Sequence, residues 1–151
     1  MKGIPAVYFN SLFGKSNDEA KYIITGNNRD VNRYKWNYKN ISKKLDNKNS
    51  KQSIFYQKIS SLLSVKRKQK AFHPNALRQN VNLGSKIFSF KRISIKKKQT
   101  IICITNLSSK FQKAKLNRIY HNWKNLIGPK IEIRNKLLIL KPFETIWLSN
   151  K

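Results

Sequence analysis

The sequence predicts an α+β chain in which one strand–loop–helix unit precedes a small antiparallel all-β domain. An apolar run over residues 4–9 lacks polar alternation, which is typical of a strand buried on both faces. Apolar residues recur at helical spacing over residues 50–68. From residue 86 onward the pattern changes to short segments of period two. These three patterns predict two domains, residues 1–76 and 77–151.

The first domain is predicted to begin with the strand over residues 4–9. Its Pro5 lies near the start of the run, where a strand tolerates proline. A segment rich in Gly, Asn and Asp follows over residues 10–36, and loops of this length are usually functional or disordered. The polar stretch over residues 39–49 is predicted to be a further loop or linker.

A helix is predicted over residues 50–68, with Ser50 or Ser53 as its cap. Its basic last turn suits the negative end of the helix dipole. The predicted apolar face consists of Ile54, Phe55, Ile59, Leu62 and Leu63.

Turn signals divide the second half of the chain into short strands. Gly84-Ser85, Gly128-Pro129 and Lys141-Pro142 are examples of such signals. Short strands with polar turns predict a small antiparallel sheet or sandwich. The predicted strands are residues 86–92, 100–106, 112–116, 130–133, 136–140 and 145–148.

The charge of the chain is extreme, since 33 Lys and Arg face 6 Asp and Glu and give a net charge of +27. A positive field of this size attracts phosphates, so a small basic nucleic-acid-binding protein is an alternative function. We favour mutational drift as the origin of this charge, because Lys, Asn and Ile are enriched together, as they are in genomes rich in A and T. Only seven of the basic residues are Arg, whose planar fork reads bases and phosphates best. Nucleic acid is therefore an unfavoured partner.

Cys103 is the only cysteine and lies within an apolar run, which predicts a buried structural thiol. The sequence carries no Cys/His spacing for zinc and no Gly-rich phosphate motif, so we expect no metal and no cofactor. It also lacks a secretory signal pattern and an apolar stretch of the roughly 20 residues that a bilayer span needs. We therefore expect a cytoplasmic protein without a membrane partner.

The long loop holds the candidate substrate-binding residues Arg29, Asp30, Asn32 and Arg33. Two Arg forks beside an amide supply directional hydrogen bonds, which suit hydroxyl-rich or anionic ligands. A purely structural role, in which Arg29 and Asp30 fix the loop to the scaffold, is the open alternative.

Segments 3–9, 12–18 and 28–33 resemble the eighth strand and following loop of sucrose phosphorylases and related sugar phosphorylases, in the α-amylase family (glycoside hydrolase family 13). Residues 71–76 and 140–148 are similar to that group's passage into its C-terminal β domain and to the end of that domain. The resemblance implies that residues 3 to about 70 are the last βα unit of a (β/α)8 TIM barrel. It further implies a chain truncated at its start.

The resemblance also implies roles. Arg29 would hold the glucosyl ring at the cleavage subsite, and Asp30, Asn32 and Arg33 would shape the loop. Retaining phosphorolysis of an α-glucoside to a sugar phosphate needs two carboxylates, which the family takes, with a third Asp, from upstream strands. None of the six acids here sits in a matching motif, so we assign no catalytic residue.

We therefore expect a C-terminal fragment that is inactive alone, although whether it acts as an enzyme is left open. Its implied partners are a glucoside and phosphate in the intact parent enzyme, and an upstream barrel fragment. We also expect residues 1–70 to be poorly soluble in isolation, because one βα unit cannot close a barrel.

Overall fold

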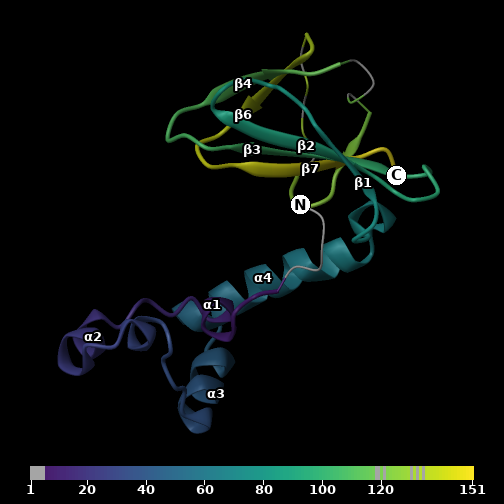
Figure 1. Ribbon diagram of the computed structural model, residues 1–151. Coiled ribbons are helices and arrows are strands. Elements are labelled where there is room, and N and C mark those ends of the chain that lie inside the picture. The colour runs from purple at the N-terminus through teal and green to yellow at the C-terminus, as the bar shows by residue number, and fades with distance from the viewer. Residues whose placement is uncertain (1–5, 118–119, 121, 130, 132, 134) are drawn as a thin grey trace. The chain divides into compact units, whose positions relative to one another are not determined.

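The computed structural model describes residues 6–117, 120, 122–129, 131, 133 and 135–151. It divides into two compact units, Pro5–Ser64 and Val65–Lys151 (Figure 1). The domain boundary predicted between residues 76 and 77 stays a prediction. The compact units divide earlier in the chain, because the segment that follows the longest helix packs on the second unit's sheet.

The first unit is helical. The strand predicted over residues 4–9 is absent from the described part of that run: residues 6–8 have no regular structure, and Phe9 begins a helix. The physical reason is that a strand needs partner strands for its backbone groups, and no described strand pairs with these residues. The elements are α1 (Phe9–Leu12), α2 (Glu19–Thr25), the 3-10 helix η1 (Asn28–Val31), α3 (Tyr38–Asp46) and α4 (Lys51–Arg67).

Helix α4 confirms the helix predicted over residues 50–68. Ser50 acts as its cap, because its Oγ accepts a hydrogen bond from the Ser53 backbone N–H at 3.0 Å. The Ser50 hydroxyl also donates to the Lys44 carbonyl, which joins the cap to the preceding helix. The predicted apolar face is only partly covered. Ile54, Phe55, Leu62 and Leu63 are all exposed.

Helix α3 lies where a loop or linker was predicted over residues 39–49, so that prediction is wrong. The Asn37 side chain caps the helix by accepting from the Asn40 backbone N–H at 3.3 Å. Ile41 is its buried residue. Lys43 and Lys44 lie in the last turn, where their positive charges interact favourably with the negative end of the helix dipole. One buried contact and a good cap thus hold a helix whose sequence is mostly polar.

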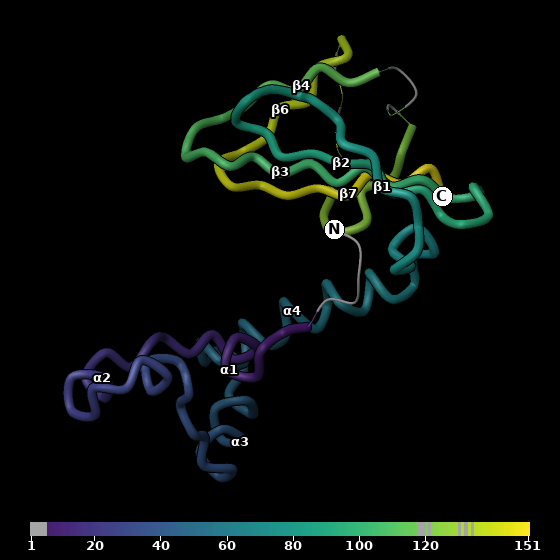
Figure 2. Tube along the Cα trace, in the orientation of Figure 1, coloured from purple at the N-terminus to yellow at the C-terminus, as the bar shows by residue number. Residues whose placement is uncertain are grey.

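The second unit contains a five-stranded antiparallel sheet in the order β1-β2-β3-β7-β5 and a two-stranded sheet of β4 and β6. Figure 2 shows β2, β3 and β7 running side by side, as their pairing requires. The elements are the 3-10 helix η2 (Lys70–Phe72), β1 (Leu77–Asn80), β2 (Ile87–Ile93), β3 (Thr100–Asn106), β4 (Gln112–Lys115), β5 (Lys124–Asn125), β6 (Leu137–Leu140) and β7 (Thr145–Ser149).

Both faces of the central strand β3 are buried, and this places the core. Ile102 and Ile104 lie in the larger cluster, together with residues of β4, β6 and β7. Ile101 and Cys103 point to the opposite face, where η2 covers them with Ala71 and Phe72. The second unit is therefore layered, with η2 on one side of the five-stranded sheet and the β4–β6 pair on the other.

A buried polar network fixes η2 to the sheet. Gln99 Oε1 accepts from the Ala71 backbone N–H at 2.9 Å, and Gln99 Nε2 donates to Gln69 Oε1 at 2.7 Å. Arg92, which is itself buried, donates from Nε to the Ala71 carbonyl at 3.2 Å and from a terminal nitrogen to the His73 carbonyl. These bonds satisfy backbone groups that η2 buries, as buried polar groups require.

The predicted strands of the second unit are confirmed in five cases: β2, β3, β4, β6 and β7 fall on the predicted segments. The strand predicted over residues 130–133 lies partly outside the described residues, and its described members Ile131 and Ile133 form no strand. Strands β1 and β5 were not predicted.

We expect Cys103 to be unreactive in the folded chain. The side chain is buried, and this burial raises the pKa of the thiol to about 12. Because the folded pKa exceeds the unfolded one, this thiol should favour the folded state at neutral pH and cease to do so as pH rises towards 12. A thiol reagent at pH 8 should label Cys103 only after urea is added. Rapid labelling without denaturant would contradict the buried position.

Candidate functional site

The loop that carries the predicted site is locally well defined. Helix α2 ends at Gly26, which adopts a left-handed φ of +64° and needs glycine there. The Asn27 side chain then accepts from the Arg29 backbone N–H at 3.0 Å and opens η1. The Asp18 backbone N–H donates to the Val31 carbonyl at 2.7 Å, which holds the end of η1 beside the start of α2.

The structure places the four predicted residues in and directly after η1. Arg29 and Asp30 belong to η1, Asn32 ends it, and Arg33 follows. The Arg29 and Arg33 side chains are exposed, and within the described residues Arg29 makes no side-chain hydrogen bond or ion pair. Arg29 is therefore free to meet a ligand.

Asp30 has a structural contact instead. Its Oδ1 lies 3.5 Å from Lys21 Nζ, the one ion pair within the described part of the chain. Thr25, through a side-chain hydrogen bond, and Lys21, through its charge, hold the pKa of Asp30 below its ordinary value, while desolvation opposes them. Arg33 adds a further positive charge nearby. Asp30 is thus a charged residue that joins η1 to α2.

The loop is anchored by Asn10, a buried residue that the sequence analysis did not single out. Its Nδ2 donates to the Asn32 carbonyl at 3.0 Å and to the Tyr34 carbonyl at 3.1 Å. Its Oδ1 accepts from Trp36 Nε1 at 2.8 Å. One side chain therefore holds the chain at three points after η1. A polar residue directly after an apolar run was the only sequence signal for this role.

Aromatic rings pack around this anchor. The Phe13 ring contacts the rings of Phe9, Trp36 and Tyr56, with centroid distances of 5.1, 5.9 and 5.8 Å. Gly14 has a left-handed φ of +58°, and a Cβ there would lie 2.9 Å from the Phe55 ring. The close approach of Gly14 to α4 therefore needs glycine. The Trp36 ring contributes to this packing.

Replacement of Asn10 by Ala is expected to destabilise the first unit by about 2 kcal/mol, because two carbonyls and the Trp36 N–H lose a buried partner. Faster limited proteolysis within residues 26–36 would report the loosened loop. The matched control is Asn40→Ala, because the Asn40 side chain is exposed. This variant should leave the rate of proteolysis within residues 26–36 unchanged. Equal cleavage of both variants would contradict the anchoring role.

Two further acids make local structural contacts. Asp18 caps α2 by accepting from the Lys21 backbone N–H at 3.1 Å, and Glu144 accepts from the Lys141 backbone N–H at 2.8 Å. No group of three or more His, Cys, Asp or Glu suited to a metal ion occurs in the described ranges. The described helices also include none that is long and apolar enough to cross a membrane.

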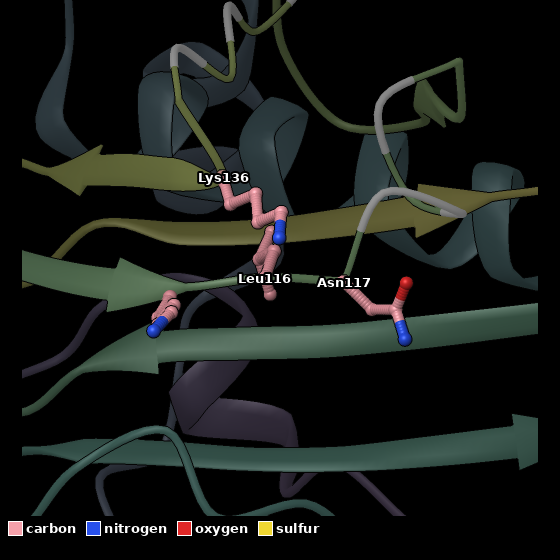
Figure 3. Close-up of a pocket in the computed structure, with 4 residues that line it drawn as sticks. Leu116, Asn117 and Lys136 are labelled. Carbon is pink, nitrogen blue, oxygen red and sulfur yellow. The ribbon is translucent and has the colours of Figure 1, made fainter.

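An open hollow of about 320 Å³ lies in the second unit, lined by Lys115, Leu116, Asn117 and Lys136 (Figure 3). Leu116 forms its buried floor, and the two lysines and Asn117 are exposed at its rim. None of the predicted site residues lines this hollow.

Comparison with curated proteins finds sugar phosphorylases. The chain is 30% identical over 148 residues to the glucosylglycerate phosphorylase of Allomeiothermus silvanus, covering 98% of this chain and 24% of that protein. It is 26% identical over 150 residues to the glucosylglycerate phosphorylase of Escherichia coli K12, covering 97% of this chain and 26% of that protein. No family model matches the chain.

The chain is also similar in fold to parts of solved structures. The chain aligns with the trehalulose synthase MutB of Pseudomonas mesoacidophila MX-45 at a TM-score of 0.54 and 16% identity, over 72% of this chain and 19% of that one. The α-glucosyl transfer enzyme XgtA gives a TM-score of 0.55 at 14% identity, over 73% of this chain and 19% of that chain. At these identities the likeness concerns the fold alone.

The sequence matches and the fold matches are both to carbohydrate-active proteins, as the resemblance to the α-amylase family predicts. More particularly, the chain is similar to the C-terminal part of sucrose phosphorylase-like sugar phosphorylases, as the motifs of residues 3–9 and 28–33 predict. It spans about a quarter of the length of these two curated relatives.

Proposed function

We propose that this chain forms the C-terminal part of a sugar phosphorylase that cleaves an α-glucoside with phosphate, and that Arg29 contacts the glucosyl ring. The observation that carries the proposal is the match to glucosylglycerate phosphorylases along 97–98% of the chain. Glucosylglycerate, which those relatives are named for, is the first substrate to test.

Residues up to α4 are proposed to complete a (β/α)8 barrel as its last βα unit. The apolar face of α4 supports this, because Ile54, Leu62 and Leu63 are large side chains that are only partly covered. Residues 6–8 would become a strand once neighbouring strands supply hydrogen-bond partners. The loop after that strand would then lie at the C-terminal face of the barrel, where active sites of such barrels are found.

Arg29 is the residue best placed to act on a ligand. Its guanidinium is exposed and has no partner within the described residues, so its donors are available to sugar hydroxyls. The backbone that carries it is fixed by the Asn27 cap. The Lys21–Asp30 pair joins η1 to α2. A fixed donor of this kind lowers the cost of orienting a sugar before reaction.

A retaining phosphorolysis needs two carboxylates about 5 Å apart. Asp18, Asp30 and Glu144 make local structural contacts instead. We therefore propose that the reacting carboxylates belong to parts of the protein beyond these residues, and that residues 1–151 alone do not catalyse phosphorolysis.

A chimera tests the proposal. Residues 1–151 would replace the matching segment of the Escherichia coli glucosylglycerate phosphorylase, and release of the glucosyl phosphate would be measured with glucosylglycerate and phosphate. Sucrose and phosphate would be assayed beside it. We expect activity from the chimera and none from residues 1–151 alone. A chimera that folds, as judged by a cooperative thermal transition, and is inactive with both substrates would contradict the proposal.

A further inference from the structure

Two turns at one end of the second unit are joined by a single buried side chain. Asn106 is fully buried, and its Nδ2 donates to the Lys110 carbonyl at 2.7 Å and to the Lys141 carbonyl at 2.8 Å. Its Oδ1 accepts from the Ser108 backbone N–H at 2.9 Å. The Phe143 backbone N–H also donates to the Ser108 carbonyl at 3.2 Å. The β3–β4 and β6–β7 turns are therefore held side by side.

Large apolar side chains lie on these turns and on the adjoining strand β6. Within the described part of the second unit, five such side chains are at least 60% exposed, and four of them lie here: Leu107 at 61%, Phe111 at 66%, Ile139 at 60% and Phe143 at 67%. The fifth, Ile95, lies in the β2–β3 turn. Phe143 has a φ of +55°, a conformation that bulky residues rarely adopt.

Lysines lie beside these apolar residues in the sequence or in the backbone pairing. Lys113 lies opposite Ile139 in the β4–β6 pair, and the Lys86 carbonyl accepts from the Leu107 backbone N–H. Lys110 and Lys141 belong to the turns themselves, and all four lysines are exposed. The β6–β7 turn also holds Glu144, whose Oε2 accepts a hydrogen bond from the Lys141 backbone N–H. We call the four apolar residues and four lysines the two-turn surface.

We propose that the two-turn surface binds anionic phospholipid bilayers, whereas the sequence alone predicted no membrane partner. Apolar side chains on adjacent turns gain free energy by entering the boundary between headgroups and acyl chains, and lysines around them are attracted to anionic lipids. Both features are needed, because the charge draws the chain to the bilayer and the apolar residues hold it there. The buried Asn106 keeps the turns in place, so little ordering is required on binding.

The side-chain chemistry favours lipid over nucleic acid. Single-stranded nucleic acid is held by aromatic rings that stack on bases. Leu107 and Ile139 have no ring to stack, yet they make up half of the exposed apolar set. Aliphatic and aromatic side chains alike gain from an apolar medium, so a bilayer accounts for all four.

The test uses co-sedimentation of the full chain with vesicles of two parts phosphatidylcholine to one part phosphatidylglycerol, and with phosphatidylcholine alone. Binding is expected only to the mixed vesicles and should weaken as salt is raised. The variant F111S/F143N, in which Asn tolerates the left-handed conformation, should bind about tenfold more weakly or worse. The control I95S/L77S, at exposed apolar residues elsewhere on the unit, should bind as the unchanged chain does.

The position of the positive charges that bind lipid is tested with two matched charge-reversal variants. The variant K110E/K141E should bind about tenfold more weakly or worse, because two charges that face the lipid change sign. The control K96E/K98E makes the same change in net charge within the β2–β3 turn, at the other end of the β2–β3 hairpin. It should retain most of the binding. Cooperative thermal melting of each variant verifies its fold.

Several outcomes would overturn this assignment. Equal loss in both charge variants would mean a general charge effect, and absent or lipid-independent binding would exclude an anionic bilayer. A single-stranded oligonucleotide bound with the same dependence on Phe111 and Phe143 would assign the surface to nucleic acid. Self-association that F111S/F143N abolishes would assign it to a second copy of the chain. The test does not depend on the proposed phosphorylase function.

Discussion

Replacement of Arg29 by Met in the chimeric phosphorylase is expected to lower kcat/KM for phosphorolysis at least about hundredfold, a loss of about 2.7 kcal/mol of transition-state stabilisation. The reason is that an exposed guanidinium, held on η1 and free of partners within the described residues, would lose every hydrogen bond to the glucosyl ring. Initial rates of phosphate-dependent cleavage at several substrate concentrations measure the effect.

Two further variants sharpen this prediction. Arg29→Lys keeps the charge and loses the planar fork, so an intermediate rate is expected. Arg33→Met removes the same type of side chain four residues later, where we expect a role in loop shape and a loss of less than about tenfold. A chimera in which Arg29→Met and Arg33→Met have equal, small effects would refute a ring contact by Arg29.

The strands of the second unit were predictable because their signals are local. Alternation and turn residues indicate β2, β3, β4, β6 and β7 from a few neighbouring positions. The burial of both faces of β3 was not predictable, because it depends on η2 reaching the sheet through Arg92 and Gln99. Strand β1 was missed since it is an edge strand with little apolar content, paired only with β2.

The first unit was less predictable because its structure depends on distant contacts. The α3 sequence is rich in Lys and Asn, and its cap at Asn37 and buried Ile41 are single residues within that polar stretch. The run over residues 4–9 has the composition of a buried strand, yet composition supplies no neighbouring strand. Pairing with other strands therefore decides whether this segment forms a strand.

The candidate site stays a prediction, and the structure shows the local contacts of its residues. The sequence indicated the segment and its four polar residues, and the structure adds that Asp30 pairs with Lys21 while Arg29 is exposed. The anchor Asn10 was missed because it lies 22 residues before Asn32, whose carbonyl it binds. Hydrogen bonds across such a separation leave no periodic signal in the sequence.

The network around η2 should dominate the stability of the second unit. Arg92→Met is expected to lower the free energy of unfolding by about 3 kcal/mol, because the buried Ala71 carbonyl and the part-buried His73 carbonyl lose a charged donor. Urea unfolding should show a lower midpoint with an unchanged slope. It is followed by fluorescence in a Trp36→Phe/Trp123→Phe background, in which Trp147 is the remaining tryptophan. Arg67→Met, at an exposed Arg of the same unit, is the control and should cost less than about 0.5 kcal/mol. Gln99→Leu should cost about 2 kcal/mol, because the Ala71 N–H then lacks an acceptor. Equal midpoints for Arg92→Met and Arg67→Met would show that η2 is held by apolar packing alone.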